Sequence, residues 1–564
     1  MIEHVIESIQ AEMIKAGIPA KVIAELQFSE PPTIALGDIS IVCFPLAAFW
    51  GCKPPEAAIR LKDFLVSGSA SDATLQESVA EYVMAGPYLN VKLNTNWLAE
   101  HVFCPTKIKK LARPRVMVEY SQPNTHKEFH IGHMRNACYG SALVNIWRAC
   151  GRTVRAVTYN NDVGAHVAKT LWAYKKFHSG EKPPKEKGRW LAGMYVEATN
   201  ALEEHPEWKD EVSDVLRKLE MRDKSWFKLW KETRRWSLDE FHAIYKELGL
   251  KFDATFNESD VKERGHKIVD ELLARGIARE SQGAIIMDFE TQKKGVLILR
   301  KSDGAGNYTT SDLALAQEKF KKFKTDEAVI IIDKRQGLYF EQLFATLHAY
   351  GFTQQLTSLL YELVTLPEGA MSSRKGNVVL YETLRDDVVE AAITETKKRH
   401  TDWADKKIHT TAHALAIAAI KFTMVRTSPQ KVIVFDKDEM LAFDGYTAPY
   451  LEYTLARINS IFKKAPASKK VPKHFSWSAS EHALWVKLAR EPLACKHAAA
   501  TNDPSVIAKY CFELAKDFAS YYENTRVLDD DASTRAARLG LIKRIAHTLA
   551  ASMTLLGLPL ITEM

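Results

Sequence analysis

The sequence predicts a multidomain α/β protein with a parallel β-sheet in its central domain. The chain has 564 residues, which is too long for a single hydrophobic core. From residue 115 onwards, short apolar runs alternate with helical patterns, as in parallel α/β units. From about residue 384 to the end, nearly every segment has helical periodicity. We therefore expect three parts, at residues 1–106, 107–383 and 384–564.

The first part is expected to be a small α+β domain. Residues 1–11 mix apolar and charged side chains, which indicates an amphipathic helix rather than a signal peptide. The apolar run at 39–44 and the alternating segment 86–93 predict strands. A basic linker with Lys107, Lys109, Lys110 and Arg113 follows.

The central part begins with a strand, a helix and a second strand. Residues 116–120 and 154–159 are the strands, and residues 132–150 form the helix, which Gly151 is placed to stop. Residues 178–250 carry Trp, Lys, Glu and Leu at helical spacing and indicate a helical insertion. Strands are expected to complete one open sheet at 284–289, 296–300, 328–333 and 361–366.

Composition excludes several classes of protein. No run of about 18 uncharged apolar residues occurs, so no membrane span is expected. The seven cysteines form no C-x-x-C pair, which argues against structural zinc and a disulfide framework and fits a reducing cytoplasm. The net charge of +7 permits a polyanionic partner without requiring one. One basic cluster could be either a solvated loop or a phosphate contact, namely Lys463, Lys464, Lys469, Lys470 and Lys473.

The sequence His130-Ile131-Gly132-His133 stands between the first strand and the long helix. Free N–H groups at a helix start favour a phosphate there. Gly132 has no Cβ to block a nucleotide, and both histidines can donate hydrogen bonds. A motif this short is weak evidence on its own.

The residues around this motif resemble the corresponding segment of the arginyl-tRNA synthetases, a class I family. That family carries a pattern close to (E/D)-(F/Y)-S-x-P-N-x-x-K-x-x-H-x-G-H-x-R, matched here by Glu119, Ser121, Pro123, Asn124, Lys127, His130, Gly132, His133 and Arg135. The segment 371–376, Met-Ser-Ser-Arg-Lys-Gly, is similar to the family's basic loop. Ala370 replaces the loop's usual first lysine, and the resemblance implies that Lys127 compensates. The sequence leaves open how Lys127, Arg374 and Lys375 divide the contacts with the ATP phosphates.

The resemblance implies a fold and an activity. The fold would be a Rossmann-like catalytic domain with a helical insertion, a small tRNA-contacting N-terminal domain and an all-α anticodon-binding domain. The activity would be ATP-dependent conversion of L-arginine to arginyl-adenylate and its transfer to the terminal ribose of tRNA(Arg). The family default is a cytoplasmic monomer, with Mg²⁺ bound to ATP. The implied catalytic residues are Lys127, His130, His133, Arg374 and Lys375, and the implied ATP contacts are His130, Gly132, His133, Met371, Ser372 and Lys375.

An arginine pocket needs acceptors for a planar, forked guanidinium, ideally a carboxylate. By resemblance, Asp312 and Tyr308 would hold the guanidinium, and the rest of the amino acid would contact Glu119, Ser121, Asn124 and Gln336. A further family segment spans residues 162–166, where His166 replaces a glutamine.

Residues implied in tRNA contact lie at both ends of the chain: Tyr88 and Asn90, then Tyr450, Tyr453, Arg457 and Met564. Helix packing is an equal alternative for any one of Tyr450, Tyr453 and Arg457. Three rival functions remain at this point: a class I synthetase for another amino acid, a non-catalytic RNA-binding paralogue, and a small nucleotidyltransferase.

Overall fold

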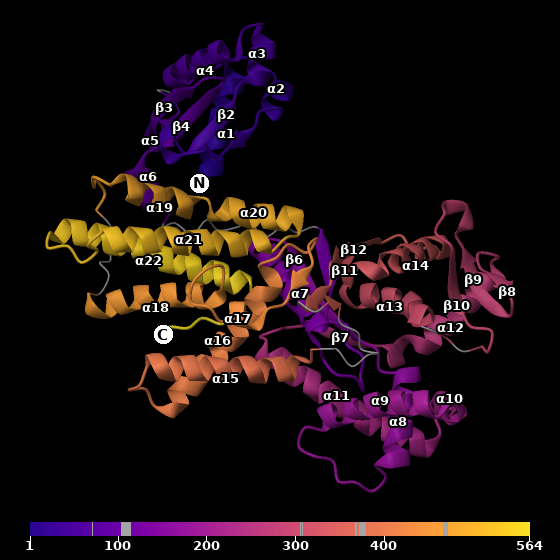
Figure 1. Ribbon diagram of the computed structural model, residues 1–564. Coiled ribbons are helices and arrows are strands. Elements are labelled where there is room, and N and C mark those ends of the chain that lie inside the picture. The colour runs from indigo at the N-terminus through magenta and orange to yellow at the C-terminus, as the bar shows by residue number, and fades with distance from the viewer. Residues whose placement is uncertain are drawn as a thin grey trace.

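Three bodies follow one another along the chain in the computed structural model, which describes residues 1–69, 72–102, 114–304, 306, 308–366, 369–370, 379–465 and 472–564. The N-terminal domain sits at one end, above a helical C-terminal domain, and the parallel sheet lies beside that helical domain (Figure 1). The expected multidomain α/β class is confirmed.

The N-terminal domain is a four-stranded antiparallel sheet covered by helices. Its strand order is β1 (Phe28–Ser29), β2 (Ile39–Val42), β4 (Tyr88–Leu93) and β3 (Val79–Ala85). The strands expected at 39–44 and 86–93 are therefore present as β2 and β4. Its helices are α1 (Ile2–Lys15), α2 (Ala20–Ala24), α3 (Phe44–Trp50), α4 (Pro54–Ser69), α5 (Ala73–Ser78) and α6 (Thr95–His101).

The central sheet has five parallel strands. Their order is β12 (Gln355–Tyr361), β11 (Glu327–Asp333), β5 (Arg115–Glu119), β6 (Thr153–Asn160) and β7 (Ala254–Asn257). The long helix after β5 is α7 (Ile131–Ala149), and α12 (Glu258–Ala274), α13 (Tyr308–Phe323) and α14 (Gly337–Tyr350) flank the other strands. Chain order reverses around β5, and a ligand crevice is expected at the carboxyl ends of the strands there.

The prediction that one sheet includes all the central strands was wrong. β9 (Ala284–Asp288) lies between β10 (Val296–Arg300) and β8 (Arg279–Ser281) and pairs with both in a separate antiparallel sheet. The connection between β9 and β10 is too short for the crossover that parallel neighbours need, so they form a hairpin. Residues 361–366 also divide: residue 361 ends β12, and β13 (Val364–Leu366) joins β14 (Gly369–Ala370) and β15 (Ile433–Val434).

The insertion is helical, as expected. It contains α8 (Ala165–Phe177), α9 (Lys187–Glu204), α10 (Lys209–Glu220) and α11 (Lys224–Glu247). Its core is mainly aliphatic and also contains the buried Trp172 and Trp230. Figure 1 shows these helices grouped together below strand β7 of the sheet.

The rest of the chain is almost entirely helical. It comprises α15 (Tyr381–Arg399), α16 (Asp405–Val425), α17 (Lys437–Met440), α18 (Ala448–Lys464), α19 (Ala479–Ala489), α20 (Glu491–Thr501), α21 (Ser505–Asn524) and α22 (Ala532–Leu555). By length and composition α16 could cross a membrane, but 72% of its apolar window is buried among other helices, as in a core helix. Helix α7 packs against α16, α20 and α22, so this helix of the catalytic domain shares one hydrophobic core with the helical domain.

Candidate active site

A cavity of about 1140 Å³ opens at the carboxyl ends of the parallel strands. Its walls come from β5, β6, α7, α12, α13 and α14, and the insertion adds Leu216 and Glu220 at its rim. It therefore lies where the reversal of strand order predicts a ligand site. Nine of the residues proposed from the sequence line it: Glu119, Asn124, His130, Gly132, His133, His166, Tyr308, Asp312 and Gln336.

The two motif histidines cap the start of α7. His130 Nδ1 accepts hydrogen bonds from the backbone N–H groups of Gly132 and His133, at 3.1 and 3.4 Å. His133 Nδ1 accepts in turn from the His130 backbone N–H at 3.3 Å, and the two rings stack with their centroids 3.8 Å apart. Because Nδ1 is the acceptor in both rings, Nε2 carries the proton in neutral imidazole. Each ring therefore keeps one N–H donor for a ligand.

The histidines are uncharged at neutral pH. Burial lowers the pKa of His130 to about 4, with Lys127 acting in the same direction. Burial and the neighbouring His130 keep the pKa of His133 well below its usual value. Positive charge near the motif comes instead from Lys127, whose ammonium lies 4.4 Å from the centre of the Tyr195 ring on α9. The helical insertion thus positions this lysine.

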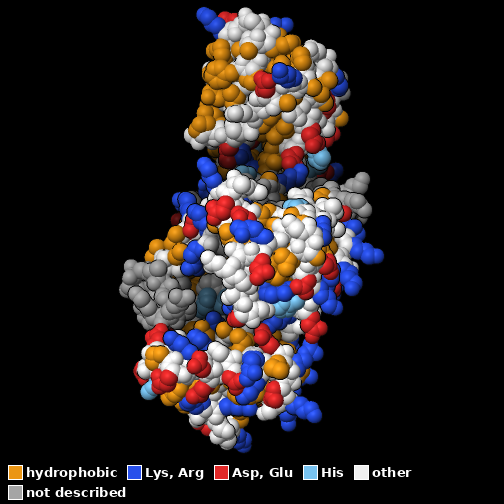
Figure 2. Space-filling model, turned by 90° about the vertical axis from the view of Figure 1, so that its right-hand side faces the viewer, with side chains coloured by type: hydrophobic (Ala, Val, Ile, Leu, Met, Phe, Trp, Pro, Cys, Tyr) orange, Lys and Arg blue, Asp and Glu red, His pale blue; other side chains and the backbone are white. Residues whose placement is uncertain are grey.

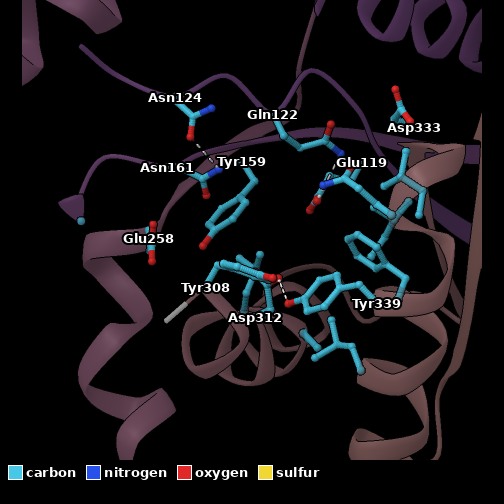
Figure 3. A pocket seen from close by; sticks show the side chains of 18 of the residues that line it. Glu119, Gln122, Asn124, Tyr159, Asn161, Glu258, Tyr308, Asp312, Asp333 and Tyr339 are labelled. Carbon is cyan, nitrogen blue, oxygen red and sulfur yellow. Dashed lines mark hydrogen bonds between the residues drawn. The ribbon is translucent and has the colours of Figure 1, made fainter. Parts of the chain in front are cut away.

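At the other end of the cavity, Asp312 lies among tyrosines on α13 (Figure 3). Tyr339 donates a hydrogen bond to Asp312 Oδ2 at 2.6 Å. The Tyr308 ring meets the Tyr339 ring edge-on, with centroids 4.9 Å apart, and 58% of Tyr308 is exposed. Burial raises the pKa of Asp312 to about 7, although Tyr339 and Lys319 oppose the shift. A cationic ligand would favour the ionised carboxylate.

Glu119 is paired with a lysine that was not predicted from the sequence. Lys319, on α13, forms an ion pair with the Glu119 carboxylate, and each side chain is only 5% exposed. Gln122 Nε2 lies 3.5 Å from the other carboxylate oxygen. Nearby, Asn161 donates to Asn124 Oδ1 at 3.3 Å, which orients the Asn124 amide. This wall of the cavity is polar, but its carboxylate, Glu119, is neutralised by Lys319.

Glu258 is an acidic residue of the cavity that was not predicted from the sequence. It is the first residue of α12, lines the cavity near Tyr308 and accepts a hydrogen bond from Ser311 Oγ at 3.2 Å (Figure 3). Burial, followed by the charges of Asp312 and Asp162, raises its pKa to about 8. The sequence held one local signal for this residue, namely a carboxylate at the start of a helix that directly follows a strand. That strand, β7, was not predicted, so the signal could not be recognised. With Asp312, Glu258 makes this end of the cavity suited to a cation.

Ser121 corrects one expectation. Its side chain is fully buried outside the cavity lining, and its hydroxyl donates to Tyr245 at 2.9 Å. Its φ of 59° turns the chain at the end of β5, which explains the direction of the side chain. The serine hydroxyl is therefore not offered to an arginine. Four residues expected to bind ATP or to act in catalysis lie outside the described residues, namely Met371, Ser372, Arg374 and Lys375.

The proposed tRNA contacts fall into two regions. In the N-terminal domain Tyr88 is 40% exposed, but Asn90 is only 2% exposed because β4 is a central strand, so the Asn90 side chain is not available to RNA. Figure 2 shows hydrophobic side chains gathered on one face of this domain, and its exposed aromatic residues include Phe44 and Phe49.

The second region is helix α18. The Arg457 guanidinium lies over the rings of Tyr453 and Tyr522, at 5.4 and 4.9 Å. Tyr450 packs against Phe512 and is half-buried. Met564 packs against the helical core.

In the described ranges, no three or more His, Cys, Asp or Glu side chains stand close enough to hold a metal ion.

Comparison with known proteins gives consistent matches over the whole chain. Residues 95–436 match the family model described as tRNA synthetases class I (R), catalytic domain, and residues 451–564 match the DALR anticodon binding domain. The chain is 37% identical to the arginine–tRNA ligase of Bdellovibrio bacteriovorus, over 94% of this chain and 92% of the relative. It is 32% identical to that of Treponema pallidum, over 96% and 95%.

Solved structures give the same picture. The Thermus thermophilus arginyl-tRNA synthetase superposes with a TM-score of 0.82 at 27% identity, covering 100% of both chains. The Plasmodium falciparum arginyl-tRNA synthetase superposes with a TM-score of 0.78 at 20% identity, covering 100% of this chain and 99% of the other.

Proposed function

Because this chain belongs to the arginyl-tRNA synthetase family and is an ATP-dependent arginine–tRNA ligase, we propose that its cavity divides the two substrates between opposite ends. Arginine occupies the end with Asp312 and Glu258, and ATP occupies the end with the capped histidines. The observation that carries this proposal is the separation of charge. Buried acids gather at one end, while neutral donors and Lys127 gather at the other.

At the acidic end, Asp312 and Glu258 bind the guanidinium. A guanidinium stays protonated at every physiological pH and fits planar carboxylate acceptors. Tyr339 holds Asp312 in place through its hydrogen bond, and Tyr308 covers the entrance. A neutral amino acid would leave the carboxylates unpaired, so the pocket rejects it without a separate editing site.

At the polar wall, Glu119, Asn124 and Gln336 contact the α-amino and carboxylate end of arginine. Lys319 cancels the Glu119 charge, so this wall supplies hydrogen bonds rather than a second cation site. The α-carboxylate of arginine is then directed toward the start of α7 and the ATP α-phosphorus.

At the ATP end, the nucleotide packs against Gly132, and the Nε2–H groups of His130 and His133 donate to phosphate oxygens. ATP carries its own Mg²⁺, held by the phosphates. No general base is needed, because the attacking carboxylate is already ionised at neutral pH. The carboxylate attacks the α-phosphorus, pyrophosphate leaves, and the terminal ribose hydroxyl of tRNA(Arg) then attacks the adenylate carbonyl. The reaction is accelerated because the enzyme positions the two substrates and stabilises the charge that develops in the transition state.

The tRNA is held by the two outer domains. Tyr88 and the exposed aromatic face of the N-terminal domain contact one part of it, and Tyr453 and Arg457 on α18 stack on anticodon-loop bases. The enzyme acts in the cytoplasm as a monomer. Light scattering coupled to gel filtration checks the monomer, and a mass near twice 63.7 kDa would contradict it.

The test of the arginine site is Asp312→Asn, compared with Glu318→Gln. Glu318 lies on the same helix with its side chain 44% exposed, so it controls for a change of charge on α13. Removing one partner of a buried charge pair costs about 2–5 kcal/mol, which raises the KM for arginine about 30-fold to several thousand-fold. The Kd for tRNA stays within twofold. Equal loss of both affinities would mean that Asp312 supports the fold rather than arginine.

The test of the phosphate role is Lys127→Met, compared with Lys169→Met. Lys169 approaches the same Tyr195 ring, at 5.9 Å, and is the matched control. We expect the rate of ATP–pyrophosphate exchange to fall at least tenfold for Lys127→Met and to change little for Lys169→Met. If the two variants behave alike, the effect belongs to the Tyr195 contact and not to ATP.

A further inference from the structure

Two cysteines from different domains meet at the end of α7 that lies away from the active site. Cys150 caps the carboxyl end of that helix, and Cys495 lies within α20 of the helical domain. They are 345 positions apart in the sequence, yet their Sγ atoms are 3.4 Å apart. Both are free thiols.

Two further contacts, both on one side of the cysteines, hold the two helices in this alignment. Trp147 Nε1 donates a hydrogen bond to the Ala499 carbonyl at 3.1 Å, one turn from the cysteines on each helix. Farther along α7, the Tyr139 hydroxyl donates to the Asn502 carbonyl at 3.0 Å. The thiols therefore meet in the interface between α7 and α20, which we call the seam. Because several contacts fix this interface, the short distance between the thiols does not depend on one side chain.

The two thiols differ in reactivity. Cys150 is half-buried and reachable by a small solute, whereas Cys495 is 6% exposed. The contact with Cys495 lowers the pKa of Cys150, and Lys496 and Arg152 act in the same direction. The contact with Cys150 and burial raise the pKa of Cys495. Because thiolates are the nucleophiles, Cys150 is the residue that reacts first.

We propose that Cys150 and Cys495 form a peroxide-responsive pair whose oxidation to a disulfide cross-links the catalytic domain to the helical C-terminal domain. The Cys150 thiolate attacks one oxygen of hydrogen peroxide, the O–O bond breaks, and hydroxide leaves, giving a sulfenic acid. The Cys495 thiol attacks that sulfur, its proton is lost, and the sulfenic hydroxyl departs as water. In sum, two thiols and one hydrogen peroxide give one disulfide and two waters.

The geometry suits this closure. A disulfide has an S–S distance of about 2.05 Å, so the two sulfurs need to approach by only about 1.4 Å to bond. The bond would tie the far end of the helix that carries His130 and His133 to the domain that carries α18. It would thereby fix the catalytic site relative to the proposed anticodon surface.

The pairing is tested by peptide mapping of the full-length enzyme. Protein treated with hydrogen peroxide is alkylated with iodoacetamide, digested and analysed by mass spectrometry, before and after dithiothreitol. Cys495→Ser removes the second thiol, and Cys52→Ser, at another half-buried free cysteine, is the matched control. We expect a Cys150–Cys495 linked peptide in the wild type and in Cys52→Ser, its loss in Cys495→Ser, and its reversal by dithiothreitol.

Three results would overturn the proposal, and two of them come from the peptide map. One is a wild type in which both thiols remain alkylatable under peroxide that oxidises Cys52, and the other is Cys150 linked to a different cysteine. Thermal unfolding adds a readout of the cross-link itself. The linked form should melt about 2 °C or more above the reduced form, with no shift in Cys495→Ser. A linked form that melts below the reduced enzyme would show that the thiols do not meet in the native seam.

Discussion

The affinity for arginine should depend on pH through Asp312. In the empty cavity, burial raises the pKa of this carboxyl to about 7, so about half of the molecules hold a proton on it at pH 7. A bound guanidinium favours the ionised form and lowers that pKa, so binding releases the proton. The affinity must therefore fall as the pH falls through 7.

The size of the effect follows from the ionised fraction. With a pKa of about 7, that fraction drops from about one half at pH 7 to about 3% at pH 5.5, and the affinity should weaken about 16-fold. Glu258, with a pKa of about 8, faces the same space and adds to the loss if the guanidinium also requires its charge. The histidines do not contribute, because burial keeps the pKa of His130 at about 4 and that of His166 at about 3.

Isothermal titration of arginine into the enzyme measures both consequences. The Kd is determined from pH 5.5 to 7 at constant ionic strength. At pH 7, two buffers with different heats of ionisation should report release of about half a proton or more per arginine. Glu318→Gln should behave as the wild type, and Asp312→Asn should lose the part of the pH dependence that comes from Asp312, leaving only what Glu258 contributes. A wild-type Kd that stays within twofold over this range, with buffer-independent heats, would refute the role given to Asp312.

Substitutions at three buried positions, the last of them on helix α18, test the packing of the fold. Lys319→Met leaves Glu119 buried without its partner and should lower the free energy of unfolding in urea by about 3–5 kcal/mol; adding Glu119→Gln should recover most of it, and no recovery would argue against the pair. Gly140→Ala places a Cβ 2.2 Å from the Tyr120 ring, so its thermal midpoint should fall with a loss of about 1–3 kcal/mol; an unchanged midpoint would contradict that packing. Burial raises the pKa of Glu452 to about 8 from 4.5, so the folded state keeps a proton that the unfolded state has lost and stability declines as pH rises between these values. Glu452→Gln should remove that decline, which urea unfolding at pH 5 and 8 would detect; parallel slopes for variant and wild type would count against it.

Features that depend on neighbours along the chain were predictable. The motif from His130 to His133 follows a β-strand and opens a helix, and the structure shows the two imidazoles capping that helix. Strand alternation, helical period and capping involve residues within one or two turns of each other, so the sequence displays them directly. The same reasoning located α7, β5, β6 and the helical insertion.

Features that depend on which distant segments meet were decided only by the tertiary structure. The hairpin of β9 and β10 has strand-like sequences, and only its short connection excludes it from the parallel sheet. Asn90 has a polar side chain, but the central position of β4 buries it. The sequence shows Glu119 only as an acidic residue, whereas in the fold it is neutralised by Lys319, which lies 200 positions later in the chain.

What the sequence alone determined is therefore the class of protein, the position of the histidine motif at the start of α7 and the presence of Asp312. The tertiary structure added Glu258 to the acidic end, removed Ser121 from the pocket, and brought Cys150 against Cys495. The physical reason is that charge, burial and pKa are set by all the groups within a few ångströms of a side chain. Those groups come from strands and helices that the chain brings together only when it folds.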